Sequence, residues 1–234
     1  MDIIISGTSR GIGFATAKAA LEHGRHRVIG ISRTDAGVED LQEIAKKAGK
    51  NATFHYLEAN LGEENYAAAL NRQLEVISFS PEILINNAGA LIKKDFADFN
   101  KSDFEYIFRM NFWSAFFLIQ NVLPHLKEGS HIVNISSMGG YQGSAKFNGL
   151  SMYAAAKAAI ANLSESLAEE FKDKKISVNA LCPGAVQTEM LTEAFPGFKA
   201  PVTPDEMGHF IFNFALESGK IMNGKVIPLS LSNP

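Results

Sequence analysis

The sequence predicts a single-domain α/β protein, residues 1–234, built on a doubly wound parallel sheet of about seven strands with helices on both faces. The first observation is that short apolar runs alternate with helical patterns along the whole chain, which is the order of repeated β-α-β units. The second is that no linker, internal repeat or low-complexity stretch divides the 234 residues, 46% of which are hydrophobic. One sizeable core is therefore expected. Short apolar strands that are each followed by a helix are typical of a parallel sheet covered on both faces.

In the first half of the chain, the run Ile3-Ile4-Ile5 marks a strand near 2–6. The Ala-rich stretch from Phe14 to Leu21 marks a helix near 11–23. Further strands are predicted near 27–32, 52–58 and 82–86, and further helices near 38–48 and 63–78.

In the second half, the longest helical pattern, near 101–127, is apolar around its whole circumference between Phe104 and Leu118. Such a helix is expected to be buried on both sides. A helix near 204–217 has the clearest start, because Thr203-Pro204-Asp205-Glu206 combines a capping pattern with proline at the first helical position. The remaining predicted elements are strands near 130–136, 176–182 and 225–229 and a helix near 151–172.

Composition argues against several classes of partner. The formal net charge is −3 and there is no basic run, whereas binding to nucleic acid or to an anionic membrane depends on clustered Lys and Arg. Cys182 is the only cysteine, so no intramolecular disulfide is expected, and no metal site is predicted. No apolar segment reaches the roughly 20 residues that span a bilayer. Because the chain begins directly with Met1-Asp2 and a strand, we expect no secretory signal and a cytoplasmic protein.

Tyr153 and Lys157 stand four residues apart on a predicted helix, so their side chains share one face with about 6 Å of rise between them. A free tyrosine ionises near pH 10, and a fixed positive charge nearby lowers that pKa toward the range in which general acid–base catalysis is efficient. Taken alone, the pair has a simpler interpretation as a half-buried aromatic beside a solvated charge. Because the pair follows Ser137 and a glycine-rich turn in the sequence, a catalytic role is favoured over that simpler interpretation.

The glycine-rich turn is Gly7-Thr8-Ser9-Arg10-Gly11-Ile12-Gly13, between the first predicted strand and the first helix. Its three glycines let the backbone turn tightly and approach a pyrophosphate. The exposed N–H groups and the positive end of the following helix favour the negative charge of such a group. A dinucleotide is therefore expected at this turn.

Further motifs follow the predicted strands in a fixed order. They are Asn86-Asn87-Ala88-Gly89, Asn111 in the long helix, Asn134-Ile135-Ser136-Ser137, Tyr153 with Lys157, and Pro183-Gly184 with Thr188. With the glycine spacing Gly-x-x-x-Gly-x-Gly, the chain from residue 1 to about 190 resembles the compact short-chain dehydrogenases/reductases, which include 3-oxoacyl reductases and carbonyl reductases. The resemblance implies a Rossmann-like fold and an oxidoreductase that transfers a hydride between a nicotinamide and a carbonyl or alcohol group.

The resemblance implies catalytic roles for Asn111, Ser137, Tyr153 and Lys157. Tyr153 is the general acid or base, and Ser137 hydrogen-bonds the substrate oxygen where charge develops. Lys157 lowers the tyrosine pKa and holds the nicotinamide ribose, while Asn111 positions a water that links Lys157 to solvent. Ser136 competes for the serine role, but the glycines that follow place Ser137 at the family's spacing, and Ser136 would then point away from the site.

The expected cofactor is NADP(H), with NAD(H) as the alternative. The expected contacts are Gly7, Ser9, Arg10, Gly11, Ile12, Gly13, Ser32, Arg33, Asn60, Leu61, Asn87, Ala88, Gly89, Tyr153, Lys157, Pro183, Gly184, Val186 and Thr188. Arg33 at the end of the second strand, helped by Ser32 and Arg10, matches the 2′-phosphate of NADP, because a guanidinium binds phosphate bidentately. An NAD enzyme usually carries an acidic residue there, and Asp35 keeps that alternative open. Asn60 stands where relatives commonly carry an aspartate against the adenine.

The segment 189–202 is expected to close over a small carbonyl or alcohol substrate. Its Met190, Leu191, Phe195 and Phe198, with Tyr141 and Phe147 opposite, favour a partly apolar compound, and an insertion around 146–148 is expected in the pocket wall. In the family that the chain resembles, the helices near 101–127 and 151–172 form a dimer interface, so a homodimer or homotetramer is expected. The alternatives are an NAD-dependent alcohol or sugar dehydrogenase and an NADP-binding regulatory protein without turnover.

Overall fold

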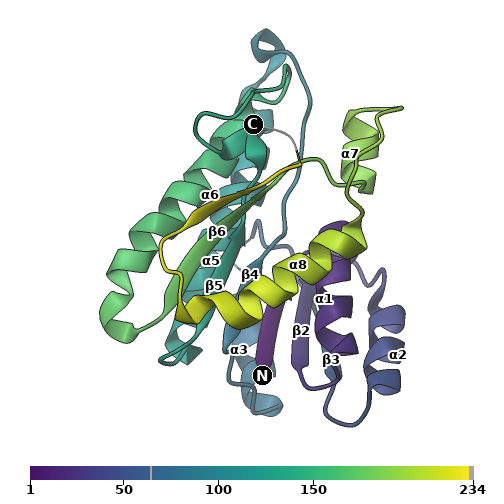
Figure 1. Cartoon of the computed structure of the whole chain (residues 1–234), viewed down its shortest axis with the longest axis vertical. Helices are drawn as coiled ribbons and strands as arrows, with labels where there is room; N and C mark the ends of the chain where they lie inside the picture. The colour runs from purple at the N-terminus through teal and green to yellow at the C-terminus, as the bar shows by residue number, and fades with distance from the viewer. Residues whose placement is uncertain (64, 232–234) are drawn as a thin grey trace.

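The computed structural model describes residues 1–63 and 65–231. Within these residues, seven parallel strands form one sheet in the order β3-β2-β1-β4-β5-β6-β7 (Figure 1). The strands are β1 (Asp2–Ser6), β2 (Arg27–Ser32), β3 (Thr53–Glu58), β4 (Ile83–Asn86), β5 (His131–Ile135), β6 (Ser177–Pro183) and β7 (Val226–Leu229). The predicted doubly wound sheet is confirmed, and its strand order reverses where β1 pairs with β4. Ligands of such sheets bind beyond the carboxyl ends of the strands at that reversal.

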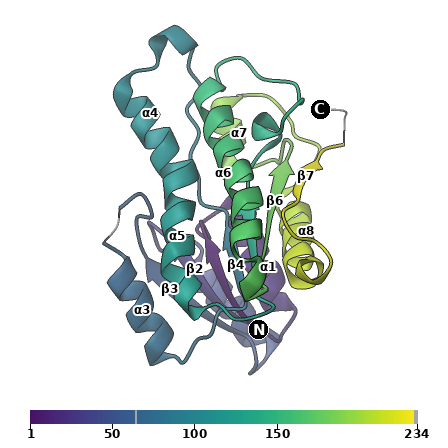
Figure 2. The ribbon, with the colours of Figure 1, turned by 90° about the vertical axis from the view of Figure 1, so that its left-hand side faces the viewer.

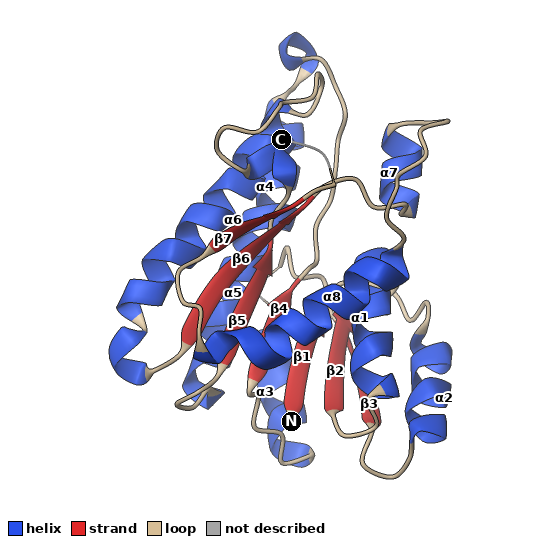
Figure 3. Ribbon diagram, in the orientation of Figure 1, coloured by secondary structure: helices blue, strands red, loops and turns tan. Residues whose placement is uncertain are grey.

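Helices cover both faces of the sheet (Figure 2, Figure 3). One face carries α1 (Gly11–Glu22), α2 (Val38–Ala48) and α8 (Pro204–Glu217), and the other carries α3 (Ala67–Val76), α5 (Ser114–Val122) and α6 (Ser151–Glu170). Ile3 and Ile5 of β1 belong to the core under the first group, whereas Ile4 belongs to the core under the second. Successive side chains of a strand point to opposite faces, so one run of isoleucines contributes to both cores.

The single helix predicted near 101–127 is divided in the structure. α4 (Lys101–Phe108) passes into a π-helical turn at Arg109–Trp113, which continues as α5 and ends in a 3-10 turn at Leu123–His125. Figure 2 shows α4 and α5 as one long rod beside α6. Asn111 lies in the wider turn and donates from Nδ2 to Ile107 O at 2.9 Å. Single π-helical turns are frequent at functional sites, and periodicity does not reveal them because the chain stays helical.

Two other boundaries differ from the sequence prediction. α3 begins at Ala67 rather than near 63, and residue 64 of the predicted helix lies outside the described residues. A short helix, α7 (Glu189–Ala194), occupies the segment for which the sequence predicts only a cover over the substrate. Thr188 caps α7, because its Oγ1 accepts from Leu191 N at 3.2 Å. A helix this short has too few turns to show a helical period in the sequence.

α8 begins as predicted at the Thr203 cap. Thr203 Oγ1 accepts from Glu206 N at 3.3 Å, and Glu206 Oε2 accepts from Thr203 N at 2.8 Å, with Pro204 at the first helical position. α8 lies close to α1, since a Cβ on Gly208 would fall 2.5 Å from the carbonyl carbon of Ala15. Across residues 1–63 and 65–231, no helix has the length and apolar character needed to cross a membrane.

Candidate active site

The glycine-rich turn forms an anion cradle between β1 and α1. Gly7 and Gly11 have φ angles of 77° and 58°, the left-handed conformation that favours glycine. A Cβ on Gly13 would collide with Gly7 O and Asn87 Nδ2, so glycine at this position lets α1 approach the turn closely. α1 has no side-chain cap and no acidic residue in its first turn. No side chain of α1 itself therefore neutralises its first N–H groups and its positive end, which favour an anion.

A cavity of 1090 Å³ opens at the carboxyl ends of the strands, where the strand order reverses. All four predicted catalytic residues line it, and so do all the predicted cofactor contacts except Gly13 and Asn60. Gly13 lies outside the cavity wall, and its lack of a side chain lets α1 pack closely against the turn at Gly7. The Asn60 side chain is bound locally, with Oδ1 accepting from Gly62 N at 3.1 Å and Nδ2 donating to Glu63 Oε1 at 2.6 Å. The contact of Asn60 with the adenine therefore stays a prediction, while its neighbour Leu61 lines the cavity.

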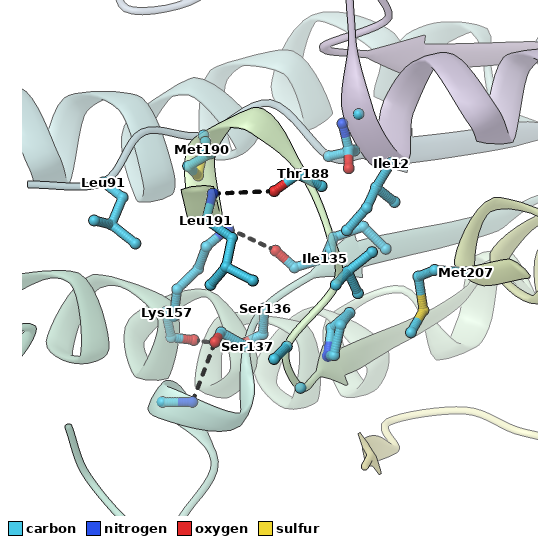
Figure 4. A pocket seen from close by; sticks show the side chains of 18 of the residues that line it. Ile12, Leu91, Ile135, Ser136, Ser137, Lys157, Thr188, Met190, Leu191 and Met207 are labelled. Carbon is cyan, nitrogen blue, oxygen red and sulfur yellow. Dashed lines mark hydrogen bonds between the residues drawn. The ribbon is translucent and has the colours of Figure 1, made fainter. Parts of the chain in front are cut away.

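Tyr153, Ser137 and Lys157 meet in this cavity, and Figure 4 shows Ser137 and Lys157 in its wall. Ser137 follows β5, and its Oγ accepts from Gly139 N at 3.1 Å and shares a hydrogen bond with Tyr153. Lys157 Nζ lies 5.8 Å from the centre of the Tyr153 ring and donates to Ile135 O at 2.8 Å. The helix α6 thus presents the phenol and the ammonium on one face, and the end of β5 supplies the serine.

Burial controls the protonation of both groups on α6. It raises the pKa of Tyr153, and the hydrogen bond with Ser137 opposes that change. It lowers the pKa of Lys157 to about 8, against a smaller raising contribution from Cys182. The expectation that the tyrosine pKa is lowered is therefore wrong for the protein alone. Desolvation of the phenol is the largest cause, and the hydrogen bond with Ser137 offsets only part of it.

Ser136 is directed away from the reacting groups. Its hydroxyl donates to Lys157 O at 2.6 Å in a buried position, which ties the end of β5 to α6 (Figure 4). Adjacent residues of an extended chain point to opposite sides, so the side chain of Ser137 lies toward Tyr153. This geometry supports Ser137 as the serine of the site.

Asn111 joins three segments through its amide. Nδ2 donates to Ala90 O at 2.8 Å and to Ile107 O at 2.9 Å, and Oδ1 accepts from Ala90 N at 3.2 Å. A Cβ on Gly89 would fall 2.6 Å from Asn111 Oδ1 and 3.4 Å from Lys157 Nζ. The buried amide therefore holds the turn at Gly89 beside the lysine, and the water-positioning role implied by the resemblance stays a prediction.

Residues 2–197 match the family model of the short chain dehydrogenases. The chain belongs to this family. It is 29% identical over 237 residues to the 3-oxoacyl-acyl-carrier-protein reductase FabG of Aquifex aeolicus, which covers 96% of this chain and 93% of that protein. It is 32% identical over 195 residues to the uncharacterized oxidoreductase YhdF of Bacillus subtilis, which covers 82% of this chain but 65% of that protein. The chain is an oxidoreductase of the short-chain dehydrogenase/reductase family.

Solved structures show the same fold. A dehydrogenase/reductase from Sinorhizobium meliloti has a TM-score of 0.86 at 25% identity and covers 97% of this chain and 92% of its own. A short chain dehydrogenase from Burkholderia cenocepacia in complex with NADP has a TM-score of 0.86 at 23% identity, over 97% and 95% of the two chains. A 4-hydroxyisoleucine dehydrogenase complexed with NADH has a TM-score of 0.83 at 24% identity, over 98% and 96%. The neighbours with this fold thus include a complex with NADP and a complex with NADH.

At the end of β2, this short-chain dehydrogenase/reductase presents an arginine to the cavity. Arg33 is exposed and lines the cavity, whereas Asp35 does not line it. Ser32 is buried, and its hydroxyl donates to Thr34 O at 2.9 Å, so that proton is not free for a phosphate. Arg10 lines the cavity from the start of α1. Both arginines therefore line the same cavity.

The remaining wall of the cavity is mostly apolar. Phe147 and the expected residues of 189–202, namely Met190, Leu191, Phe195 and Phe198, line it, whereas Tyr141 does not. The structure adds Leu91, Met138, Leu150, Pro201, Val202, Met207, Phe210 and Leu229 to the wall. These residues carry no motif, so only the tertiary structure brings them together. In the part of the chain that the structure describes, no group of three or more His, Cys, Asp or Glu is arranged to hold a metal ion.

Proposed function

We propose that the chain is a single-domain, NADPH-preferring oxidoreductase that transfers a hydride between the nicotinamide and a carbonyl or alcohol group of a small, largely apolar molecule. The observation that supports the proposal most strongly is the meeting of Tyr153, Ser137 and Lys157 in the cavity that begins at the glycine cradle. A regulatory protein that only binds the cofactor has no need of that arrangement.

The residues present fit a dinucleotide. The open positive end of α1 and the left-handed glycines of the cradle suit a pyrophosphate. The cavity of 1090 Å³ is slightly larger than the roughly 300–1,000 Å³ typical of ligand sites, which leaves room for a substrate as well. Pro183, Gly184, Val186 and Thr188 line the side nearest β6 and would hold the nicotinamide end. Bound there, NADP(H) would supply the hydride.

The residues of the chain would handle the proton and the developing charge. Tyr153 donates its phenolic proton to the substrate oxygen, and Ser137 Oγ lies beside it as a preorganised hydrogen-bond donor to the same oxygen. Lys157 is mostly protonated at pH 7, below its pKa of about 8, and stabilises the phenolate that proton transfer leaves. Ile135 O and the turn at Gly89 hold the ammonium in place.

The preference for NADP(H) over NAD(H) is proposed from charge. Arg33 and Arg10 line the cavity, and each can form charge-assisted hydrogen bonds with a 2′-phosphate that NAD(H) lacks. Asp35, which would favour the free 2′-hydroxyl of NAD(H), is not part of the wall. The apolar residues around the catalytic groups support an uncharged substrate, because an anionic one would lose its solvation against them.

A homodimer or homotetramer is proposed from an aromatic surface on α4 and the π-helical turn. Phe104, Tyr106 and Trp113 are 47%, 40% and 48% exposed. The ring of Phe104 packs 4.7 Å from that of Phe108, and the ring of Trp113 packs 5.4 Å from that of Phe117. Exposed apolar side chains gathered in one region mark interaction surfaces, which supports the association through α4, α5 and α6 that the family resemblance implies.

The deciding experiment supplies purified protein with a panel of uncharged ketones, aldehydes and alcohols. NADPH, NADH and their oxidised forms are tested in parallel, and nicotinamide absorbance is followed. We expect carbonyl reduction with NADPH. Cofactor binding without turnover of any compound would favour the regulatory protein, and alcohol oxidation with NAD alone would favour the alcohol or sugar dehydrogenase.

Tyr153→Phe tests the assigned acid. The variant should lose nearly all turnover and keep cofactor affinity close to wild type, because it deletes only the transferable proton. Steady-state kcat and the Kd from nicotinamide fluorescence separate the two effects. Tyr106→Phe, which removes an exposed phenol on α4, is the matched control and should keep wild-type kcat. Substantial kcat in Tyr153→Phe would contradict the assignment.

A further inference from the structure

The lid helix α7 places two carboxylates against the phosphate cradle. Glu189 and Glu193 are four residues apart, so they share one face of the helix. Glu193 Oε1 accepts from Arg10 Nη1 at 3.3 Å, and Glu189 Oε2 lies 3.7 Å from the point that a Cβ on Gly11 would occupy. Figure 1 shows α7 above the end of α1 that carries these two cradle residues. The acidic face of α7 thus meets the residues that would receive the phosphates of a cofactor.

The position of α7 is fixed by bonds at the base of its segment. Gln187 N donates to Val202 O at 2.8 Å, and Ala200 N donates to Gln187 Oε1 at 2.7 Å. Just after the end of α7, the centre of the Phe195 ring lies 4.2 Å from Lys93 Nζ. The segment therefore closes on itself before it reaches α8, and its acidic face is held toward α1.

α1 provides no carboxylate of its own at this end, because its first turn holds no acidic residue and no side chain caps it. Negative charge is stabilised at a helix N-terminus, and Glu193 and Glu189 supply it from another element. We propose that Glu193 is a cofactor-specificity residue that competes with the 2′-phosphate of NADP(H) for Arg10 and so weakens the preference for NADP(H). The inference rests on the proposed function, since it requires the 2′-phosphate to lie beside Arg10.

The competition is weak enough for a phosphate to displace the carboxylate and strong enough to measure. The side chains of Arg10 and Glu193 are 53% and 68% exposed, and exposed ion pairs interact weakly. A phosphate engages a guanidinium bidentately and more strongly. The apparent Kd for NADPH is the intrinsic Kd divided by the fraction of Arg10 that is not paired with Glu193. For a typical exposed ion pair, this raises the apparent Kd about two- to fivefold. NADH presents no 2′-phosphate, so its Kd lies outside this competition.

Isothermal titration calorimetry of the whole chain with NADPH and with NADH, at low ionic strength, tests the proposal. Glu193→Gln should lower the Kd for NADPH about two- to fivefold and change the Kd for NADH by less than about 1.5-fold. In an Arg10→Ala background, the same substitution should leave the NADPH Kd unchanged, because the carboxylate has lost its partner. Raised salt should remove the Glu193→Gln effect, since the competing pair is exposed.

The matched control is Glu43→Gln on α2, which removes a carboxylate from the exposed ion pair with Lys47 (2.6 Å). It should change neither Kd. An unchanged NADPH Kd in Glu193→Gln would overturn the inference. So would an equal gain for both cofactors, which would place the competition at the pyrophosphate, or a gain that persists without Arg10, which would reflect a looser lid. A wild-type chain that binds neither cofactor would overturn the proposed function itself. If wild type binds NADPH and Glu193→Gln leaves that Kd unchanged, only this inference is overturned.

Discussion

Neighbouring side chains in the cavity have different tasks because their hydrogen bonds point in opposite directions. Ser136 and Ser137 are adjacent, yet the first donates to the carbonyl of Lys157 inside the fold and the second bonds with Tyr153. The distinction comes from the alternation of side chains at the end of β5. The two serines carry the same hydroxyl group and differ only in the direction in which it points. Substituting each in turn therefore tests which one acts in the site.

Ser137→Ala should reduce kcat by about 10²–10³, the loss typical of one oxyanion donor. Ser136→Ala should keep kcat within a few-fold of wild type and instead lower the free energy of unfolding by about 1 kcal/mol, because it removes a buried hydrogen bond to α6. Steady-state kinetics and urea unfolding on both variants measure the two effects. The reverse order of kcat losses would show that the register at the end of β5 is wrongly assigned.

Arg33→Asp should reverse the cofactor preference. Wild type is expected to favour NADPH by at least about tenfold in kcat/KM, since one charge-assisted contact of about 1.5–3 kcal/mol exceeds the 1.36 kcal/mol that a factor of ten needs. The aspartate removes the phosphate partner, repels the phosphate and accepts from a free 2′-hydroxyl. Arg72→Asp on α3, an exposed position with the same change of charge, should keep the preference. Equal use of both cofactors by wild type would point to Asp35.

Residue types in motifs could be predicted from the sequence, and the directions of their side chains could not. The spacing of Tyr153, Lys157 and Ser137 is enough to place them in one cavity once the fold is known. The amide of Asn60 is bound locally by Gly62 and Glu63, a competition that no spacing reveals. The raised pKa of Tyr153 has the same origin, since it depends on burial that the motif does not encode.

Among the secondary-structure elements, the site depends on how closely the turn after β5 approaches α6. A Cβ on Gly140 would fall 2.5 Å from the carbonyl carbon of Lys157 and 2.6 Å from Ala158 N. The two segments can therefore touch only because this residue has no side chain. The sequence shows the glycine as part of a motif, but the backbone contact that requires it is tertiary. Sequence prediction also misses the π-helical turn around Asn111, because the chain stays helical through it, and the helix α7, which is too short to show a helical period.

Gly140→Ala should destabilise the protein by about 1–3 kcal/mol, the range for overpacking a closely packed contact. It should also lower kcat, because the turn that carries Ser137 is pushed away from Tyr153 on α6. Gly139→Ala is the matched control for stability: its Cβ would lie 3.6 Å from Ser137 Oγ and 3.8 Å from Ala154 Cβ, an ordinary contact, so a change within about 0.5 kcal/mol is expected. Urea unfolding compares them, and equal destabilisation would contradict the steric argument.

Across the whole molecule, the two ends of the sheet differ in what they hold. The carboxyl ends open into the cavity, whereas the amino ends carry a polar layer in which Asp2 accepts from Arg27 Nε at 2.7 Å and from Ser80 N at 2.7 Å. The sheet itself could be predicted because short, mostly apolar runs alternate with helical patterns along the chain. The polar layer could not, because its members come from distant parts of the chain and become neighbours only when β1 pairs with β2 and with β4.

A buried histidine at the same end of the sheet makes the stability of the protein depend on pH. His26, next to β2, is 4% exposed, its Nε2 lies 3.1 Å from His23 Nδ1, and its ring packs edge-on against Phe212 at 5.4 Å. Burial, and then the positive N-terminus, lowers its pKa from 6.5 to about 4. Because the unfolded chain takes up this proton near pH 6.5 and the folded chain only near pH 4, the stabilisation is complete above pH 6.5 and is lost as the pH falls toward 4.

We therefore expect the free energy of unfolding to drop by about 1–3 kcal/mol between pH 7 and pH 4.5 through His26. His26→Gln should flatten this part of the profile, leaving the smaller slope due to His55 and His131, whose pKa values burial also lowers. His209→Gln, which replaces a histidine with a 53% exposed side chain, is the matched control. Urea unfolding at steps of pH measures the slopes. A His26→Gln profile as steep as wild type would show that acid sensitivity arises elsewhere, because a residue that cannot take up the proton cannot contribute to the linkage.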